Sequence, residues 1–183
     1  MKSASHTLVL EAGRTVVYPA HGVGTISGVD VQEIAGMKLE LLVVEFPQSK
    51  MTLRLPKAKA LSSGLRALAG EATIEKALGV LAGRAKARKG IWARKAADFE
   101  TKIKSGDLLQ IAEVVRDLHR GDDASSYSER QIYEQALGRL AAEIAEAQRI
   151  TETEALRTIE DRLSRGKGRA LAGDEEAVED EAA

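Results

Sequence analysis

The sequence predicts an α+β fold: a small β-barrel of Tudor or SH3 type followed by an all-α domain of about five helices. Three observations predict it. Up to about residue 60, apolar residues form short runs or alternate with polar ones, as in strands. After residue 70 they recur every three or four residues, as in helices. Between these stretches, Ser62-Ser63-Gly64 and Gly70 are typical of a hinge. We therefore expect domains at residues 1–62 and 71–165.

Four stretches of the N-terminal part predict short, bent strands. Val16-Val17-Tyr18 is a short strand, and Val23–Val31 contains two glycines that permit bending. Leu39–Phe46 is apolar on both faces, as expected of a central strand, and Ala35-Gly36 before it indicates a turn. Met51–Leu55 then alternates. So many short strands in so few residues favour a barrel.

The Met51–Leu55 strand is a candidate sheet edge. Alternation places Met51, Leu53 and Leu55 inward and Thr52 and Arg54 outward. Arg54 is either an ordinary surface charge or part of a surface that pairs its backbone with a partner strand, with the long side chain adding specificity.

Apolar periodicity predicts the helices of the C-terminal domain. Ser128 is the expected N-cap of the longest one, and Thr151 with Glu154 has capping-box spacing at the start of the last. From Gly166 the pattern dissolves into Gly, Ala and acids, which predicts an acidic disordered tail over residues 166–183. The predicted buried faces are Ile74, Leu78 and Leu81; Leu108, Ile111, Ala112, Val115 and Leu118; and Tyr133, Ala136, Leu140, Ile144 and Ala147.

Composition bounds the class of function. The chain has 183 residues, 44% of them hydrophobic and 3% aromatic, so its cores must be aliphatic. It has no cysteine, which fits a reducing cytoplasm, and no run long enough for a membrane span. The net charge of −1 averages a basic middle with an acidic tail. A local basic patch can therefore bind phosphates although the average charge is acidic.

Catalytic chemistry has little support in the sequence. The three histidines are scattered without metal-ligand spacing, and His21 lies in a turn between strands where local hydrogen bonds account for it. Acidic residues on the helices are expected on solvated faces. We predict no catalytic residues, no metal site and no cofactor, and we expect that the protein is not an enzyme.

The most informative stretch is Gly83–Lys95, which we call the basic segment. It holds six basic residues, no acid and the only tryptophan of the chain, Trp92. One interpretation is a solvated basic helix end with Trp92 packed in the core. The other follows from Gly90, which breaks the helix and leaves Trp92 at an exposed junction between cations. A large apolar group among cations suits unstacked base pairs, with Arg and Lys holding phosphates.

Several motifs together resemble the CarD/CdnL family of bacterial RNA polymerase-binding transcription regulators. Val17–Gly24 and Lys50–Pro56 resemble the family's N-terminal domain, which transcription-repair coupling factor shares. Resemblance to the C-terminal domain of the same family rests on Trp92-Ala93-Arg94-Lys95, Ser105-Gly106-Asp107, Ile111–Leu118 and Tyr127–Glu134. It covers about residues 10–165.

The resemblance implies a Tudor-like barrel that pairs with the RNA polymerase β subunit, and a helical domain whose tryptophan enters the minor groove at the upstream edge of the promoter bubble. It implies a polymerase contact by Arg54 and DNA contacts by Trp92, Arg94 and Lys95. To these we add Met51, Thr52 and Leu53 of the edge strand as predicted polymerase contacts, and Arg88 and Lys89 of the basic segment as predicted DNA contacts. Gln32 stands where some relatives carry a second arginine, and Ala97 where some carry another basic residue.

We therefore expect a cytoplasmic, monomeric regulator that binds promoter DNA largely without sequence specificity and stabilises the open complex. Two alternatives of other classes stay open: a protein-interaction adaptor without DNA contact, and an RNA- or ribosome-associated factor. An adaptor would not need the basic segment. An RNA-binding barrel would carry a basic or aromatic face, which this sequence shows little of.

Overall fold

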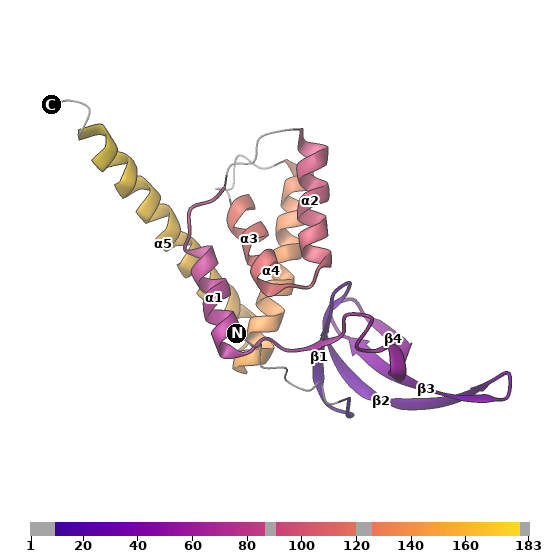
Figure 1. Cartoon of the computed structure of the whole chain (residues 1–183). Helices are drawn as coiled ribbons and strands as arrows, with labels where there is room; N and C mark the ends of the chain where they lie inside the picture. The colour runs from indigo at the N-terminus through magenta and orange to yellow at the C-terminus, as the bar shows by residue number, and fades with distance from the viewer. Residues whose placement is uncertain (1–9, 87–90, 120–125, 180–183) are drawn as a thin grey trace, which may run out of the picture. The chain divides into compact units, whose positions relative to one another are not determined.

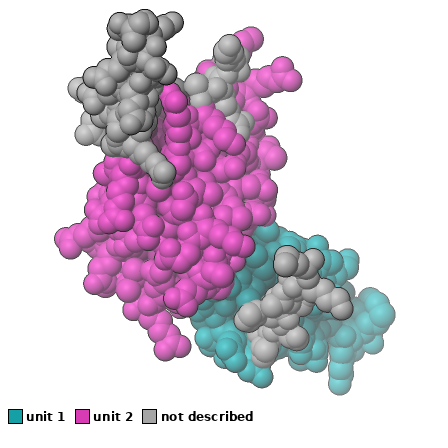
Figure 2. Space-filling view, turned by 60° about the vertical axis from the view of Figure 1, so that its left-hand side comes forward, with its two compact units in different colours: residues 1–68 teal, residues 69–183 magenta. Residues whose placement is uncertain are grey.

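The structure, a computed structural model, describes residues 10–86, 91–119 and 126–179. The chain divides into two compact units, residues 1–68 and residues 69–183. Among the described residues the first unit is built on five strands and the second on five helices (Figures 1 and 2). The predicted α+β class, with strands before helices, is confirmed.

The strands form one antiparallel sheet in the order β4-β3-β2-β1-β5. The predicted strands all exist, and β2 and β3 are longer than expected. No pair among the described residues joins the edge strands β4 and β5, so barrel closure stays a prediction. The strands are β1 Thr15–Tyr18, β2 Gly22–Ile34, β3 Met37–Phe46, β4 Met51–Pro56 and β5 Arg66–Ala67, with a 3₁₀ turn at Lys57–Lys59.

The β2–β3 hairpin turns at the predicted dipeptide. Ala35 and Gly36 both have positive φ, 52° and 77°, which a tight two-residue hairpin turn requires. Ile34 and Met37 pair directly on either side of it. A register shift between Ile26 and Gly28 bends β2 where the sequence has a glycine.

A contact between Gly24 and Phe46 organises the core of the sheet. Phe46 is buried, and a β-carbon at Gly24 would lie 2.6 Å from its ring. Only glycine lets the β2 backbone lie against that ring. The His21 ring lies on the same cluster, stacked on Tyr18 at 5.7 Å and 5.4 Å from Phe46. His21 thus lies in the turn expected from the sequence, and its ring is held by packing on Tyr18 and Phe46.

The predicted hinge lies inside the first unit. Ser62 and Ser63 hydrogen-bond to the preceding 3₁₀ turn, Gly64 abuts Pro19, and Leu65 is buried. Strand β5 then pairs with β1. The Ser-Ser-Gly pattern marks a turn with local hydrogen bonds, and the buried Leu65 returns the chain to the sheet. The division between the two units, after residue 68, falls within residues 63–70, which the expected domains 1–62 and 71–165 leave between them.

The helical unit consists of α1 Glu71–Leu81, α2 Trp92–Lys104, α3 Leu108–Leu118, α4 Tyr127–Gln148 and α5 Glu152–Glu179. Helices α2, α3 and α4 lie side by side (Figure 1). The faces predicted for α1 and α3 are buried. On α4, Ala136, Leu140 and Ile144 are buried, whereas Tyr133 and Ala147 are half-buried at the rim.

Two helix boundaries differ from those expected. The N-cap of α4 is Ser126, not Ser128: Ser126 and Glu129 form a reciprocal capping box. The Thr151–Glu154 box at α5 is confirmed. Helix α5 continues past Gly166 to Glu179, because the Arg, Ala and Leu residues that follow this glycine favour helix. The stretch predicted to be a disordered tail is therefore helical as far as Glu179, and residues 180–183 lie outside the described residues.

Two acids of the helices are buried, contrary to the expectation of solvated faces. Glu143 is 2% exposed, and its carboxylate accepts a hydrogen bond of 3.0 Å from the backbone of Ala69. This contact fixes the start of the helical unit against α4. The other buried acid is Asp117, whose side chain is 2% exposed.

We predict that Gly24→Ala destabilises the protein by about 1–3 kcal/mol, because the added methyl group overpacks against Phe46. Urea unfolding followed by circular dichroism measures this loss. Gly28→Ala is the matched control on the same strand, since a β-carbon there meets nothing within 4 Å. Equal stability of the two variants would contradict the close-approach role of Gly24.

Candidate protein and nucleic-acid interfaces

Strand β4 is an edge of the sheet, as predicted. It pairs only with β3, from Leu41 opposite Pro56 to Phe46 opposite Met51. Alternate backbone N–H and C=O groups of an edge strand point away from its one neighbour and can pair with a strand of a partner. The proline at its end limits the length that a partner strand can extend.

The side chains of β4 alternate as predicted. Thr52 and Arg54 are exposed, Met51 and Leu53 are half-buried on the core side, and Leu55 is buried. Within the part of the chain that the structure describes, the Arg54 side chain takes part in no hydrogen bond or ion pair. Its charge is therefore available to a partner.

Gln32 shares the outer face of the sheet with Arg54. Arg54 pairs with Val43 and Gln32 with Leu39, and residues 39 and 43 of β3 point to the same face because side chains alternate. The Gln32 amide donates a 3.2 Å hydrogen bond to Asp30. This face thus carries one exposed arginine and, at the hairpin, a neutral amide that already has an internal partner.

Trp92 is the first residue of α2, and its ring packs against the core of the helical unit. Its ring lies 6.5 Å from that of the buried Phe99, seven residues later on the same helix face. Trp92 is half-buried, packed against the rim of the core. The result lies between the two interpretations made from the sequence: the ring is held in place by the core and still reaches solvent.

The start of α2 is electropositive. Its first turn contains no acid, and Ile91, the N-cap, provides no side-chain acceptor for the first N–H groups. Arg94 is exposed and Lys95 half-buried in this turn. Cations and the positive end of a helix together attract phosphate. Of the other predicted DNA contacts, Arg88 and Lys89 lie outside the described residues.

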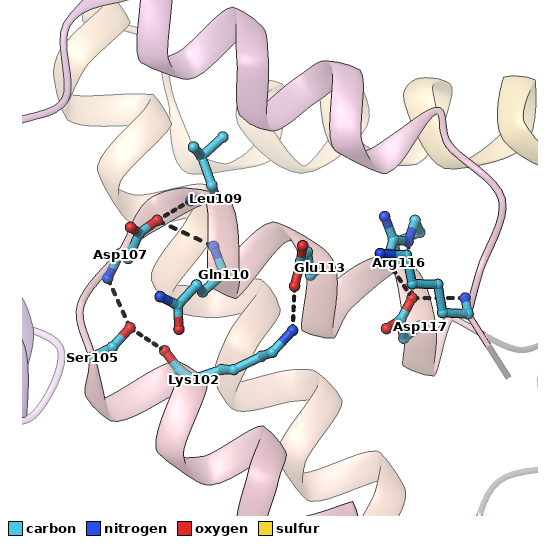
Figure 3. A network of polar contacts seen from close by, with 9 residues as sticks. Lys102, Ser105, Asp107, Leu109, Gln110, Glu113, Arg116 and Asp117 are labelled. Atoms are coloured by element: carbon cyan, nitrogen blue, oxygen red, sulfur yellow. Dashed lines mark hydrogen bonds and ion pairs between the residues drawn. The ribbon is translucent and has the colours of Figure 1, made fainter. Parts of the chain in front are cut away.

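The basic segment is tied to α3 near its beginning. The backbone N–H of Lys86 donates to Asp117 Oδ1 over 3.0 Å, and Arg116 Nε donates to the same oxygen over 2.8 Å (Figure 3). Both side chains of this ion pair are largely buried. Asp117 therefore holds the segment at Lys86, and packing on Phe99 holds it at Trp92.

Ser105-Gly106-Asp107 reverses the chain between α2 and α3. Gly106 adopts a φ of 71°, and Asp107 caps α3 by accepting hydrogen bonds from the N–H groups of Leu109 and Gln110 (Figure 3). The motif is structural. It orients α2 so that Phe99 and Ile103 face the core and Trp92 follows at the end of that face.

An ion pair next to this turn joins α2 to α3. Lys102 Nζ donates to Glu113, and this hydrogen bond holds the pKa of the Glu113 carboxyl below its usual value (Figure 3). Partial burial opposes the shift, and the charges of Lys102, Arg116 and Lys86 add to it.

Sequence reasoning missed Asp117, Phe99 and Ile91 as parts of this surface. The spacing of Phe99 from Trp92 could have indicated a contact on one helix face. The anchoring of Lys86 by Asp117 joins residues 31 positions apart and left no local signal. Within the part of the chain that the structure describes, no helix is long and apolar enough to cross a membrane.

Comparison with known proteins matches two family models and also finds similar curated proteins and solved structures. The model described as CarD-like/TRCF RID domain matches residues 10–68, and the model described as CarD, C-terminal domain, matches residues 76–160. The chain is 30% identical over 146 residues to a Bacillus subtilis (strain 168) protein named "Putative transcription factor YdeB", covering 79% of this chain and 95% of the relative.

One similar solved structure is the solution NMR structure of the 72-residue N-terminal domain of Myxococcus xanthus CarD. It is 36% identical, and the match covers 37% of this chain and 89% of that one, with a TM-score of 0.28.

The Lys102–Glu113 ion pair makes stability depend on pH. Because the folded-state pKa of Glu113 is lowered, its contribution is present above the unfolded-state pKa and is lost as pH falls through the folded one. Glu113→Gln should cost up to about 1 kcal/mol at neutral pH and little near pH 3, as judged by urea unfolding. The exposed pair Lys104–Glu100 provides the control Glu100→Gln, with a smaller loss. A Glu113→Gln deficit that is the same at both pH values would contradict the assignment.

Proposed function

The chain belongs to the CarD family of transcription factors, and from this premise we propose that it stabilises the open complex of RNA polymerase at promoters. The family is not enzymatic, and its N-terminal RID domain is an RNA polymerase-interaction domain, matched here by residues 10–68. The proposal adds which surfaces act and how.

The β4 edge is the proposed contact with the polymerase β subunit. Its backbone is open on one side, and Arg54 and Thr52 project from its outer face. Strand pairing would supply affinity, and Arg54 would select a partner with an acceptor at that position. Met51 and Leu53 would contribute through their backbones, because their side chains face the core. Gln32 would add at most a neutral contact on the same face.

The start of α2 is the proposed contact with promoter DNA, and one observation carries this assignment. Trp92 is anchored on Phe99 yet reaches solvent, at a helix start where cations gather and the first turn has no acid. An anchored aromatic ring suits the distorted minor groove at the edge of the bubble, and Arg94 and Lys95 suit its phosphates. None of these groups reads base edges, so binding would be largely independent of sequence.

The two contacts act together. The β4 edge is the tether that holds the protein on polymerase, and Trp92 is the wedge that contacts distorted DNA. Polymerase binding raises the local concentration of a weak DNA-binding surface at the promoter. A wedge that fits only distorted DNA shifts the equilibrium towards the open complex by its differential affinity. A preference of about 1.4 kcal/mol multiplies the open population about tenfold. The protein would act as a monomer, with the polymerase in the cytoplasm.

For the tether, we predict that Arg54→Glu abolishes binding to the isolated β subunit in a calorimetric titration. A reversed charge at a pairing edge adds repulsion to the loss of a contact. Lys38→Glu is the matched control, because this exposed lysine lies on the opposite face of the same sheet. Melting of both variants should resemble that of the wild type. Wild-type affinity of Arg54→Glu would place the polymerase contact elsewhere on the unit.

For the wedge, we predict that Trp92→Ala shortens the lifetime of the open complex after heparin challenge and leaves polymerase affinity unchanged. Trp92→Phe keeps an apolar ring on Phe99 and should retain part of the lifetime. Circular dichroism at the assay temperature verifies that each variant is folded. A wild-type lifetime for Trp92→Ala would contradict the wedge and favour an adaptor without DNA contact.

A further inference from the structure

Ile91, the residue before Trp92, is one of the most exposed apolar side chains of the described residues. It is 80% exposed, whereas Trp92 is half-buried. Trp92 is held back against Phe99, and Ile91 precedes the first helical turn. The apolar group that stands furthest into solvent at this helix start is therefore the isoleucine.

Ile91 also departs from the capping pattern of helices α3, α4 and α5, whereas α1 begins after Gly70, likewise without a side-chain cap. Ile91 occupies the N-cap of α2, where isoleucine is among the least favourable residues because it offers no acceptor to the free N–H groups. The N-caps of α3, α4 and α5 are Asp107, Ser126 and Thr151, each of which accepts such a hydrogen bond. A residue that is unfavourable both as a cap and as an exposed apolar group is typical of a functional site.

The surroundings of Ile91 indicate what kind of partner covers it. The basic segment leads into it, Arg94 is exposed one turn later, and the first turn of α2 contains no acid. An apolar side chain among cations complements a nucleic acid whose stacked base faces have been opened. An apolar peptide would gain nothing from these cations.

We propose that Ile91 and Trp92 form a two-residue wedge, in which Ile91 enters the distorted minor groove beside the ring of Trp92, which is anchored on Phe99. This inference rests on the proposed function and adds a DNA-contacting residue to it. The division of labour follows from burial: a ring packed on the core resists displacement, and an exposed β-branched side chain with few rotamers inserts at little cost in entropy.

The test compares Ile91→Ser with Ile91→Leu in the full-length protein. Serine removes the apolar group and supplies a good N-cap, so Tm should rise while the open-complex lifetime in the heparin challenge falls. Loss of most of one buried aliphatic side chain predicts a change on the order of tenfold. Leucine keeps the apolar group without a cap, so both values should stay close to wild type. Leu61→Ala, an exposed apolar residue of the other unit, should leave the lifetime unchanged.

Trp92→Ala, measured in the same assay, distinguishes a failure of the two-residue wedge from a failure of the proposed function. A short lifetime for Trp92→Ala with a wild-type lifetime for Ile91→Ser would overturn the two-residue wedge and leave the proposed function standing. Wild-type lifetimes for both would overturn both. A lower Tm for Ile91→Ser, or weaker binding of this variant to polymerase without DNA, would also overturn the inference, because Ile91 would then serve the fold or a protein partner.

Discussion

The apolar side chains of the protein are divided between two cores, and no residue belongs to both. One core gathers Phe46, Leu42 and their neighbours between the strands, and the other gathers residues of all five helices around Ile111 and Leu140. With so few aromatic residues, each core depends on close aliphatic packing. Each therefore holds its own surface rigidly: the first fixes the β4 edge, and the second fixes the start of α2.

Polar contacts of three carboxylates then position the backbone segments of the helical unit. Asp107 sets the turn that aims α2, Asp117 holds the beginning of the basic segment, and Glu143 holds the backbone at Ala69, where the helical unit begins. Asp107 and Asp117 thus position the start of α2, whose first turn contains cations and no acid. Because only residues 68–70 connect β5 to α1, a polymerase-bound N-terminal unit would keep the wedge at a high effective concentration near the DNA.

Much of the fold could be predicted because it depends on patterns among residues close together in the sequence. Alternation in β4, the Ala35-Gly36 turn and the buried faces of α1 and α3 depend on neighbouring residues only. The errors have non-local causes. Leu65 returns the chain to the sheet after an apparent hinge, and Glu143 is buried because a backbone N–H 74 residues away meets it. Trp92 and Arg54 were identified from composition and resemblance, but the exposure of Ile91 relative to Trp92 depends on packing that no pattern records.

The most direct test of the account asks whether the two units must be joined. Residues 1–68 and residues 69–183, made as separate proteins and verified as folded by circular dichroism, would be added together to polymerase and promoter DNA, and the open-complex lifetime compared with that given by the intact chain. The tether-and-wedge account predicts that the separate units fail to prolong the lifetime at concentrations where the intact chain saturates. Full activity of the unlinked mixture at those concentrations would contradict it.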